Sequence, residues 1–205
     1  EEYRFEMMKA AGYFMTESTG HLAEYLPYFR KSKEALERYC DEPGFGGESG
    51  AYYFFSEGVA QKYNEQDILA GESVELPSRS IEYGSYVIEA LETGRTFKLN
   101  GNVTNDGMIS NLPMDCCAEG PIYVDRTGLH KTLVGDLPPQ CAALNMTNIN
   151  VQRLAVEASV SGDPEHLVHA CALDPLTSAV LTLRETREMV SEMLEAQRQW
   201  LPQFE

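Results

Sequence analysis

The chain has 205 residues, of which 43% are hydrophobic, and its 32 acidic against 16 basic residues give a formal net charge of −16. This composition is typical of a folded protein with one real core or two small ones. The acidic excess disfavours nucleic acid and anionic membranes as partners, because no basic stripe is present to displace counterions. No apolar run approaches the ~20 residues that span a bilayer.

The five cysteines form no CxxC pair and are odd in number. This argues against a zinc site and against a secreted disulfide framework, and it fits a reducing cytoplasm. The chain opens with EEYRFEMM, which is charged and lacks the features of a signal peptide. We therefore expect a cytoplasmic protein, and an opening that drops directly into a helical pattern suggests a piece of a longer one.

Hydrophobic periodicity predicts helices first and then a change to strands. The expected helices cover residues 1–11, 19–26, 31–39, 52–69, 81–91, 140–160, 163–173, a segment after residue 175, and 183–200. The expected strands cover residues 96–103, 116–124 and 129–134, with turns at 105–107 and 125–128. Together they predict the α+β class: a small, mainly antiparallel sheet packed with helices, within one domain over residues 1–205.

Capping residues mark several helix ends. Gly12 ends the first expected helix, and Thr16 or Ser18 is a candidate cap for the second. Ser78 or Ser80 starts the helix over residues 81–91, which Gly94 closes.

The segment from Thr16 to Tyr25 concentrates acid, base and hydroxyl groups more densely than any other stretch. Glu17 and Tyr25 flank His21, which is a candidate base or metal ligand or a structural histidine at a helix. A surface carboxylate is the ordinary reading of Glu17, but neighbouring aromatic residues could desolvate it and raise its pKa. Tyr25 could act as a base only if a cation lowered its pKa.

Two further places carry polar groups suited to a hydroxyl-rich ligand. Arg79 lies in a PSRS turn and could bind a sugar hydroxyl or a carboxylate, although surface arginine is the commoner situation. Asn105, Asp106 and Asn111 lie in or just beyond an NDG turn, where turn chemistry alone explains most of the sequence. There is no glycine-rich dinucleotide loop, P-loop or H-E-x-x-H motif. Taken alone, these residues do not name a reaction.

Residues 4–29, RFEMMKAAGYFMTESTGHLAEYLPYF, resemble the family-four glycoside hydrolases, and within them the α-galactosidase (melibiase) branch with its GYF-x-TES-x-x-H-x-x-EY-x-P pattern. Further stretches agree in order, so that the resemblance covers essentially the whole chain. They are PSRSIEYGSYVIEAL, NGNVTNDGMISNLPMDCCAEGPIYVDRTGLH, LPPQCAALNMTNINVQ and HACALDPLTSAVLTLRE.

The resemblance implies the C-terminal half of an enzyme built like lactate and malate dehydrogenases, with an N-terminal Rossmann half that binds NAD. The family's metal-binding Cys and His belong to that missing half, so we assign no cofactor-binding and no metal-binding residues here. Expected partners are an α-galactoside substrate, the Rossmann half and further copies of the chain.

The resemblance also implies the chemistry of an NAD- and manganese-dependent α-galactosidase. Oxidation at C3 of the sugar acidifies the C2 proton, a base removes that proton, and the glycosidic oxygen leaves. The family's base would lie near Glu17, with His21 and Tyr25 as rivals. Arg79, Asn105, Asp106 and Asn111 would contact the substrate.

Three alternatives stay open at this point. Within the same family, α-glucosidase or α-galacturonidase activity is the near alternative, since sugar choice depends on a few hydroxyl contacts. A structural or interaction domain without catalysis is the alternative of a different class. The chain by itself is expected to be inactive.

Overall fold

The computed structural model describes residues 2–39, 55–61 and 78–204. The backbone divides into two compact units, which we describe separately. Residues 1–67 and 143–205 form the first, called the helical unit, and residues 68–142 form the second, called the sheet unit. The α+β class expected from the sequence is confirmed.

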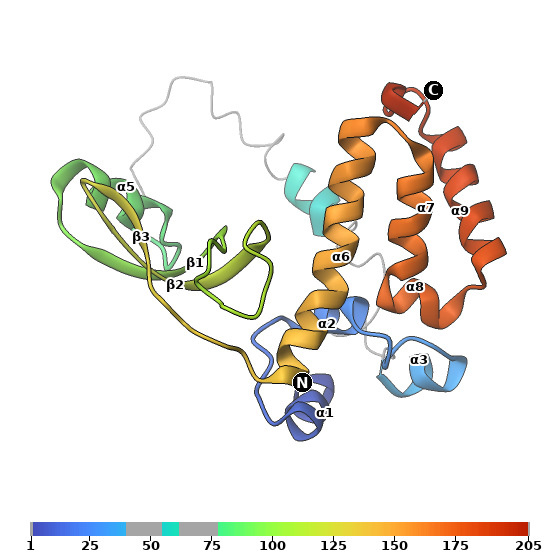
Figure 1. The fold of residues 1–205 in the computed structure, drawn as a ribbon, viewed down its shortest axis with the longest axis horizontal. Coiled ribbons are helices and arrows are strands. Elements are labelled where there is room, and N and C mark those ends of the chain that lie inside the picture. The colour runs from blue at the N-terminus through green and yellow to red at the C-terminus, as the bar shows by residue number, and fades with distance from the viewer. Residues whose placement is uncertain (1, 40–54, 62–77, 205) are drawn as a thin grey trace. The chain divides into compact units, whose positions relative to one another are not determined.

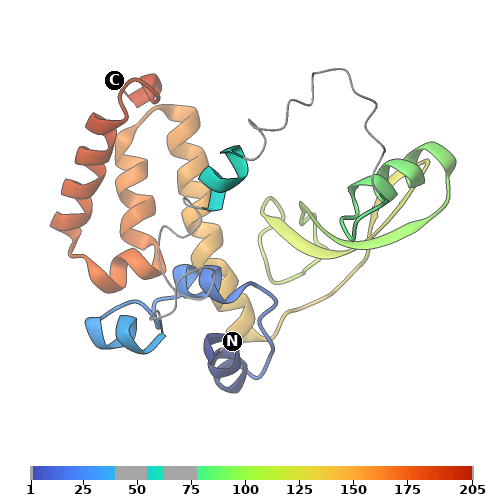
Figure 2. The same ribbon diagram turned by 180° about the vertical axis from the view of Figure 1, so that it is seen from behind.

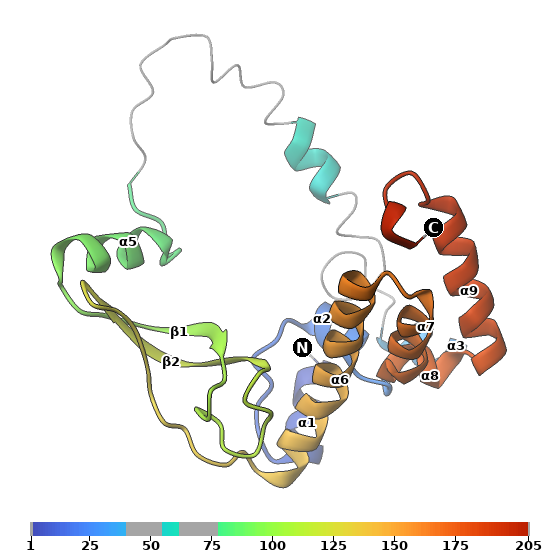
Figure 3. The same cartoon turned by 45° about the horizontal axis from the view of Figure 1, so that its top comes forward.

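The sheet unit contains a three-stranded antiparallel sheet in the order β1-β2-β3. The strands are β1 (Phe97–Thr104), β2 (Cys117–Asp125) and β3 (Gly128–Lys131). Helix α5 (Gly84–Thr93) packs against β1 and β2 and lies along the sheet (Figures 1 and 3). Its C-terminus is closed by Gly94 at φ 78°, as the sequence predicts.

The centre of this sheet depends on two glycines that face each other across β1 and β2, Gly101 and Gly120. A Cβ atom at Gly120 would lie 2.5 Å from the sulfur of Met108, so the absence of a side chain lets that thioether pack on the strand. Met108 is correspondingly buried, at 4% exposure. Met108 thereby packs the turn after β1 against β2.

The helical unit is formed by both ends of the chain. Its N-terminal helices are α1 (Glu2–Ala11), α2 (Thr19–Tyr25) and α3 (Lys33–Tyr39), and residues 55–61 are also helical. Its C-terminal elements are α6 (Pro139–Ser161), α7 (Pro164–Leu173), α8 (Pro175–Val180), α9 (Leu183–Ala196) and the 3₁₀ turn η1 (Pro202–Phe204). The first residues of α6 belong to the sheet unit.

A small aromatic core fixes the N-terminal helices of the helical unit. Tyr3 of α1 packs on Phe29 and Tyr39, with ring centroids 4.9 and 5.3 Å away. Leu22 and Leu26 complete this buried cluster from α2 and the residue that follows it. The apolar face of α2 is therefore committed to packing, which leaves its opposite face for polar groups.

Helices α7 and α9 pack side by side (Figures 1 and 2). The start of α7 is capped by Asp163 and the start of α8 by Asp174, each followed by proline, as the sequence predicts. Thr182 and Glu185 form a reciprocal capping box at the start of α9. Among the described residues, no helix combines the length and apolar character that crossing a membrane requires.

Several expected boundaries differ from the structure: α3 starts at Lys33 rather than at residue 31, and α9 ends at Ala196 rather than at residue 200. Two further differences have a local physical reason, and one expected helix is described only in part. Helix α5 starts at Gly84 rather than at residue 81, because the Ser80 hydroxyl accepts a hydrogen bond from Glu82 N in a preceding turn. Strand β3 ends at Lys131 rather than at residue 134, because Val134 N donates to the carbonyl of Met108 instead of continuing the ladder. Of the helix expected over 52–69, only residues 55–61 are described.

Candidate functional site

The three residues proposed as acid–base groups lie along α2, from just before its start to its last residue. Glu17 precedes the helix, and His21 and Tyr25 follow at intervals of four residues, which places them in a row. Glu17 Oε1 lies 3.2 Å from His21 Nδ1, and the rings of His21 and Tyr25 have centroids 6.1 Å apart. The structure therefore brings all three together.

These side chains are partly open to solvent. The side chains of Glu17 and His21 are 42% and 46% exposed, and Tyr25 is 46% exposed. Glu17 Oε1 also accepts a hydrogen bond of 2.7 Å from Ser18 N at the helix N-terminus. Ser18 occupies the N-cap position, but its side chain makes no capping bond, so the expected hydroxyl cap is not formed.

Tyr25 is placed to act as an acid or hydrogen-bond donor rather than as a base. Burial raises the pKa of its phenol, and the nearby carboxylates of Glu17 and Glu24 raise it further. A tyrosine with a raised pKa stays protonated at neutral pH, so it can donate a hydrogen bond to a ligand. Deprotonation would need a cation that offsets both carboxylates.

Arg4 of α1 holds the loop that leads into α2. Arg4 Nε donates a 3.0 Å hydrogen bond to the carbonyl of Met15, and the guanidinium lies 4.5 Å from the centroid of the Phe14 ring. Gly12, at φ 81°, ends α1 and turns the chain into this loop. Arg30, a nearly buried cation after the helix, lies 3.9 Å from Glu24. The sequence analysis missed both arginines, because nothing in their spacing marks these contacts.

Arg79 lies in the sheet unit beside α5. It forms an ion pair with Glu89, and its guanidinium lies 4.7 Å from the centroid of the Tyr86 ring. Tyr86 in turn stacks on Phe97, at 5.3 Å and 16° between ring planes. A cavity of about 350 Å³ is lined by these residues together with Arg95. Arg79 thus lies in a pocket, as a ligand-binding residue requires.

Asn105 does not lie as a substrate ligand would, which corrects the sequence-based expectation. It is fully buried, and its Nδ2 donates to the carbonyls of Ile109, Leu112 and Pro113 at 2.9, 3.2 and 3.0 Å. Its Oδ1 accepts a 2.7 Å hydrogen bond from Ile109 N. Because these bonds engage both side-chain polar atoms, a substrate contact would require opening the loop. Asn105 instead organises the turn.

Asp106 and Asn111 lie in the same turn and are exposed, but they have partners within the sheet unit. Asp106, at φ 43°, forms an ion pair with Lys131. Asn111 exchanges two hydrogen bonds with the backbone of Leu137, at 2.8 and 2.9 Å. The turn follows the last residue of β1, whereas Arg79 lies beside Phe97 at its first residue. Since an eight-residue strand is about 25 Å long, these groups do not form one site with Arg79.

Asp125 anchors the hairpin between β2 and β3. Its Oδ1 accepts hydrogen bonds from the backbone N and the hydroxyl of Thr127, at 2.8 and 2.6 Å, and lies 3.1 Å from His130 Nε2. These bonds, led by that from the Thr127 hydroxyl, lower the pKa of the Asp125 carboxyl from 3.8 to about 2. The carboxylate form is therefore favoured in the folded hairpin.

This lowered pKa gives a testable dependence of stability on pH. A carboxyl group whose pKa is lower in the folded state stabilises the fold above its unfolded pKa, and this contribution is lost as the pH falls through the folded value. We expect Asp125→Asn to lower the thermal unfolding midpoint above about pH 4, and the difference from wild type to shrink between pH 4 and pH 2. Thermal scans across that range measure it, with Glu119→Gln on the same strand as control. A pH-independent difference would contradict the assignment.

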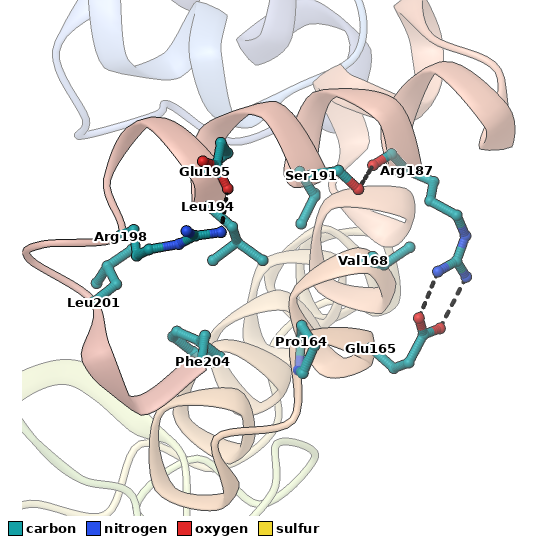
Figure 4. Close-up of a pocket in the computed structure, with 11 residues that line it drawn as sticks. Pro164, Glu165, Val168, Arg187, Ser191, Leu194, Glu195, Arg198, Leu201 and Phe204 are labelled. Carbon is teal, nitrogen blue, oxygen red and sulfur yellow. Dashed lines mark hydrogen bonds and ion pairs between the residues drawn. The ribbon is translucent and has the colours of Figure 1, made fainter.

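A second cavity, of about 650 Å³, lies in the helical unit between α7, α9 and η1 (Figure 4). Its lining is mixed: apolar side chains such as Val168, Leu194 and Phe204 lie among two ion pairs. In one pair both nitrogens of the Arg187 fork bind Glu165, and in the other Arg198 binds Glu195. None of the residues proposed from the sequence lines it.

Metal ions in proteins are held by sets of His, Cys, Asp and Glu side chains. Within 2–39, 55–61 and 78–204, no three His, Cys, Asp or Glu side chains gather as metal ligands do. Cys116, just before β2, is buried, whereas Cys117, the first residue of β2, is exposed, so the two thiols have different surroundings.

The sequence matches a domain that is found in glycosyl hydrolases. The C-terminal domain of the family 4 glycosyl hydrolases matches residues 1–177, and the chain belongs to this family. The match includes the α2 cluster, the Arg79 pocket and the 105–111 turn. Helix α9 and most of the second cavity lie beyond it.

Two curated relatives are α-galactosidases. The enzyme of Rhizobium meliloti is 40% identical over 100% of this chain and 43% of its own length, and that of Bacillus subtilis is 38% identical over 98% and 46%. The chain therefore spans less than half the length of these relatives.

Solved structures share the fold. The structure of lplD from Bacillus subtilis has a TM-score of 0.77 and 23% identity, covering 94% of this chain and 42% of that one. A 6-phospho-α-glucosidase from gut microorganisms, in complex with NAD and Mn²⁺, has a TM-score of 0.71 and 18% identity, covering 96% and 43%. At these identities the likeness shows the fold alone.

Proposed function

We propose that this chain is the C-terminal, substrate-binding and oligomerising part of an NAD- and manganese-dependent α-galactosidase. The observation that carries the proposal is the row of Glu17, His21 and Tyr25 along α2, within the residues that the family matches. The α-galactosidases at 38–40% identity favour that activity over α-galacturonidase, for which relatives are 22–25% identical.

The proposed role of the cluster is proton transfer. Glu17 would remove the C2 proton of the bound sugar, because its carboxylate is accessible to a ligand. His21, 3.2 Å away, would orient that carboxylate, and Tyr25 would donate a hydrogen bond from its neutral phenol. Arg79 would contact a sugar hydroxyl from the pocket beside α5. Redox and metal chemistry would be supplied by other parts of the full-length enzyme.

The proposal also assigns partners to exposed apolar residues. Val160, Leu183 and Trp200 are 81%, 76% and 74% exposed. Exposed apolar groups of this kind favour association. A cofactor-binding half of the enzyme and a second copy of the chain are the partners that the proposal expects.

The test is hydrolysis of p-nitrophenyl α-galactoside by the full-length protein, with and without NAD, Mn²⁺ and a thiol. We expect activity only with both cofactors, and solvent deuterium at C2 of the product. Activity without NAD, or product without deuterium at C2, would contradict the proposed elimination chemistry. If α-galactoside, α-glucoside and α-galacturonide all fail as substrates, the domain serves binding or assembly instead.

A further inference from the structure

Glu89 lies between two guanidinium groups in the pocket beside α5. Arg79 Nη1 donates to Glu89 Oε2, and Arg95 Nη1 lies 3.8 Å from Glu89 Oε1. The Glu89 side chain is 30% exposed, whereas that of Arg95 is 83% exposed. Arg95 is therefore a solvent-screened neighbour, and the close pair is Arg79 with Glu89.

The position of Arg79 is fixed by aromatic stacking as well as by charge. Its guanidinium lies on the Tyr86 ring, and Tyr86 lies nearly parallel to Phe97 at the start of β1. A cation held on one side by a ring and at one edge by a carboxylate has little freedom to turn toward another partner. The Arg79 side chain nevertheless stays 47% exposed and lines the cavity.

A guanidinium in a pocket normally favours an anionic ligand, because its fork matches a carboxylate or phosphate. Here that position is already taken by a carboxylate of the protein. The Arg79 hydrogen bond lowers the pKa of Glu89, so the negative charge persists at neutral pH. The carboxylate of an anionic ligand that entered the cavity would be repelled by the negative charge of Glu89.

We propose that Glu89 makes the Arg79 pocket select uncharged sugars over anionic ones, by occupying the guanidinium that an anionic substituent would bind. This inference rests on the proposed function, in which Arg79 contacts the substrate. It deepens that function by assigning the preference for α-galactosides over α-galacturonides to one side chain. These two sugars have the same ring stereochemistry and differ at C6, where one carries a hydroxymethyl group and the other a carboxylate.

The test is Glu89→Gln in the full-length enzyme, with kcat/KM measured on p-nitrophenyl α-galactoside and p-nitrophenyl α-galacturonide. Glutamine keeps the size of the side chain and its hydrogen bond to Arg79 but removes the charge. We expect the galacturonide-to-galactoside ratio to rise about tenfold, because removing Glu89 removes one like-charge repulsion that solvent partly screens in this half-exposed pocket. Glu92→Gln, an exposed carboxylate on the same helix, is the matched control and is expected to leave the ratio unchanged.

Calorimetric binding of free galacturonate and galactose to the same full-length proteins separates this inference from the proposed function. A gain in galacturonate binding in Glu89→Gln alone supports the inference even where no glycoside is turned over, an outcome that would count against the proposed function. If Glu89→Gln changes both the kinetic ratio and the binding preference by less than twofold, the inference about Glu89 is wrong. An equal gain in Glu92→Gln would overturn it as well, because the effect would then come from net charge.

Discussion

Replacing Glu17 by glutamine in the full-length enzyme is expected to lower kcat by about 10²–10⁴-fold, the usual contribution of a positioned general base. Glutamine keeps the size of the side chain and can accept the hydrogen bond from Ser18 N, so the start of α2 should stay intact. The amide cannot take a proton from C2 of the sugar. Exchange of the C2 hydrogen with solvent deuterium should therefore disappear together with turnover.

A matched control is available on the same helix. Glu24→Gln removes a carboxylate that lies near Arg30 rather than in the Glu17–His21 pair, and it is expected to retain most activity. If Glu17→Gln keeps near-normal turnover and C2 exchange, Glu17 is not the base. His21→Gln and Tyr25→Phe then decide between its two rivals, since only loss of the base abolishes exchange.

The second large effect concerns stability. Asn105→Ala is expected to lower the local unfolding free energy of the turn after β1 by about 3 kcal/mol, because it leaves several buried backbone groups without their hydrogen-bond partner. Three carbonyls and the Ile109 N–H lose their side-chain partner at once. Hydrogen exchange of the backbone amides of residues 105–116 measures the change directly.

Asn111→Ala is the control for this variant. Asn111 is exposed, and its loss removes two hydrogen bonds to Leu137 that water can replace. We expect a cost of at most about 1 kcal/mol, typical of an exposed hydrogen bond. Equal protection in the two variants would show that Asn105 does not organise the turn.

Much of the fold could be predicted from local chemistry. The Asp-Pro pairs that begin at residues 163 and 174 predict helix starts, and Gly94 predicts a helix end. These residues provide hydrogen bonds to the backbone groups that have no partner within the helix at its ends. The start of α5 was predicted too early, since Ser80 can cap a turn as well as a helix. Such alternatives have the same sequence signature.

The candidate site was harder to predict because a residue type does not reveal its partners. Asn105 and Asn111 look equivalent in sequence, yet one is buried with its amide fully bonded and the other is exposed. The close spacing of Glu17, His21 and Tyr25 did predict that these polar groups lie near one another. The pairing of Arg79 with Glu89 depends on how the chain before α5 folds back onto it, which periodicity does not encode.

The contact between Gly120 and Met108 has a consequence for chemical ageing. Oxidation of methionine to its sulfoxide requires access of peroxide to sulfur. Met108 is shielded by the bare backbone of β2, whereas Met114, six residues further along the same loop, is 64% exposed. Oxidants will therefore modify Met114 before Met108. The buried thioether of Met108 will stay apolar until the loop itself opens.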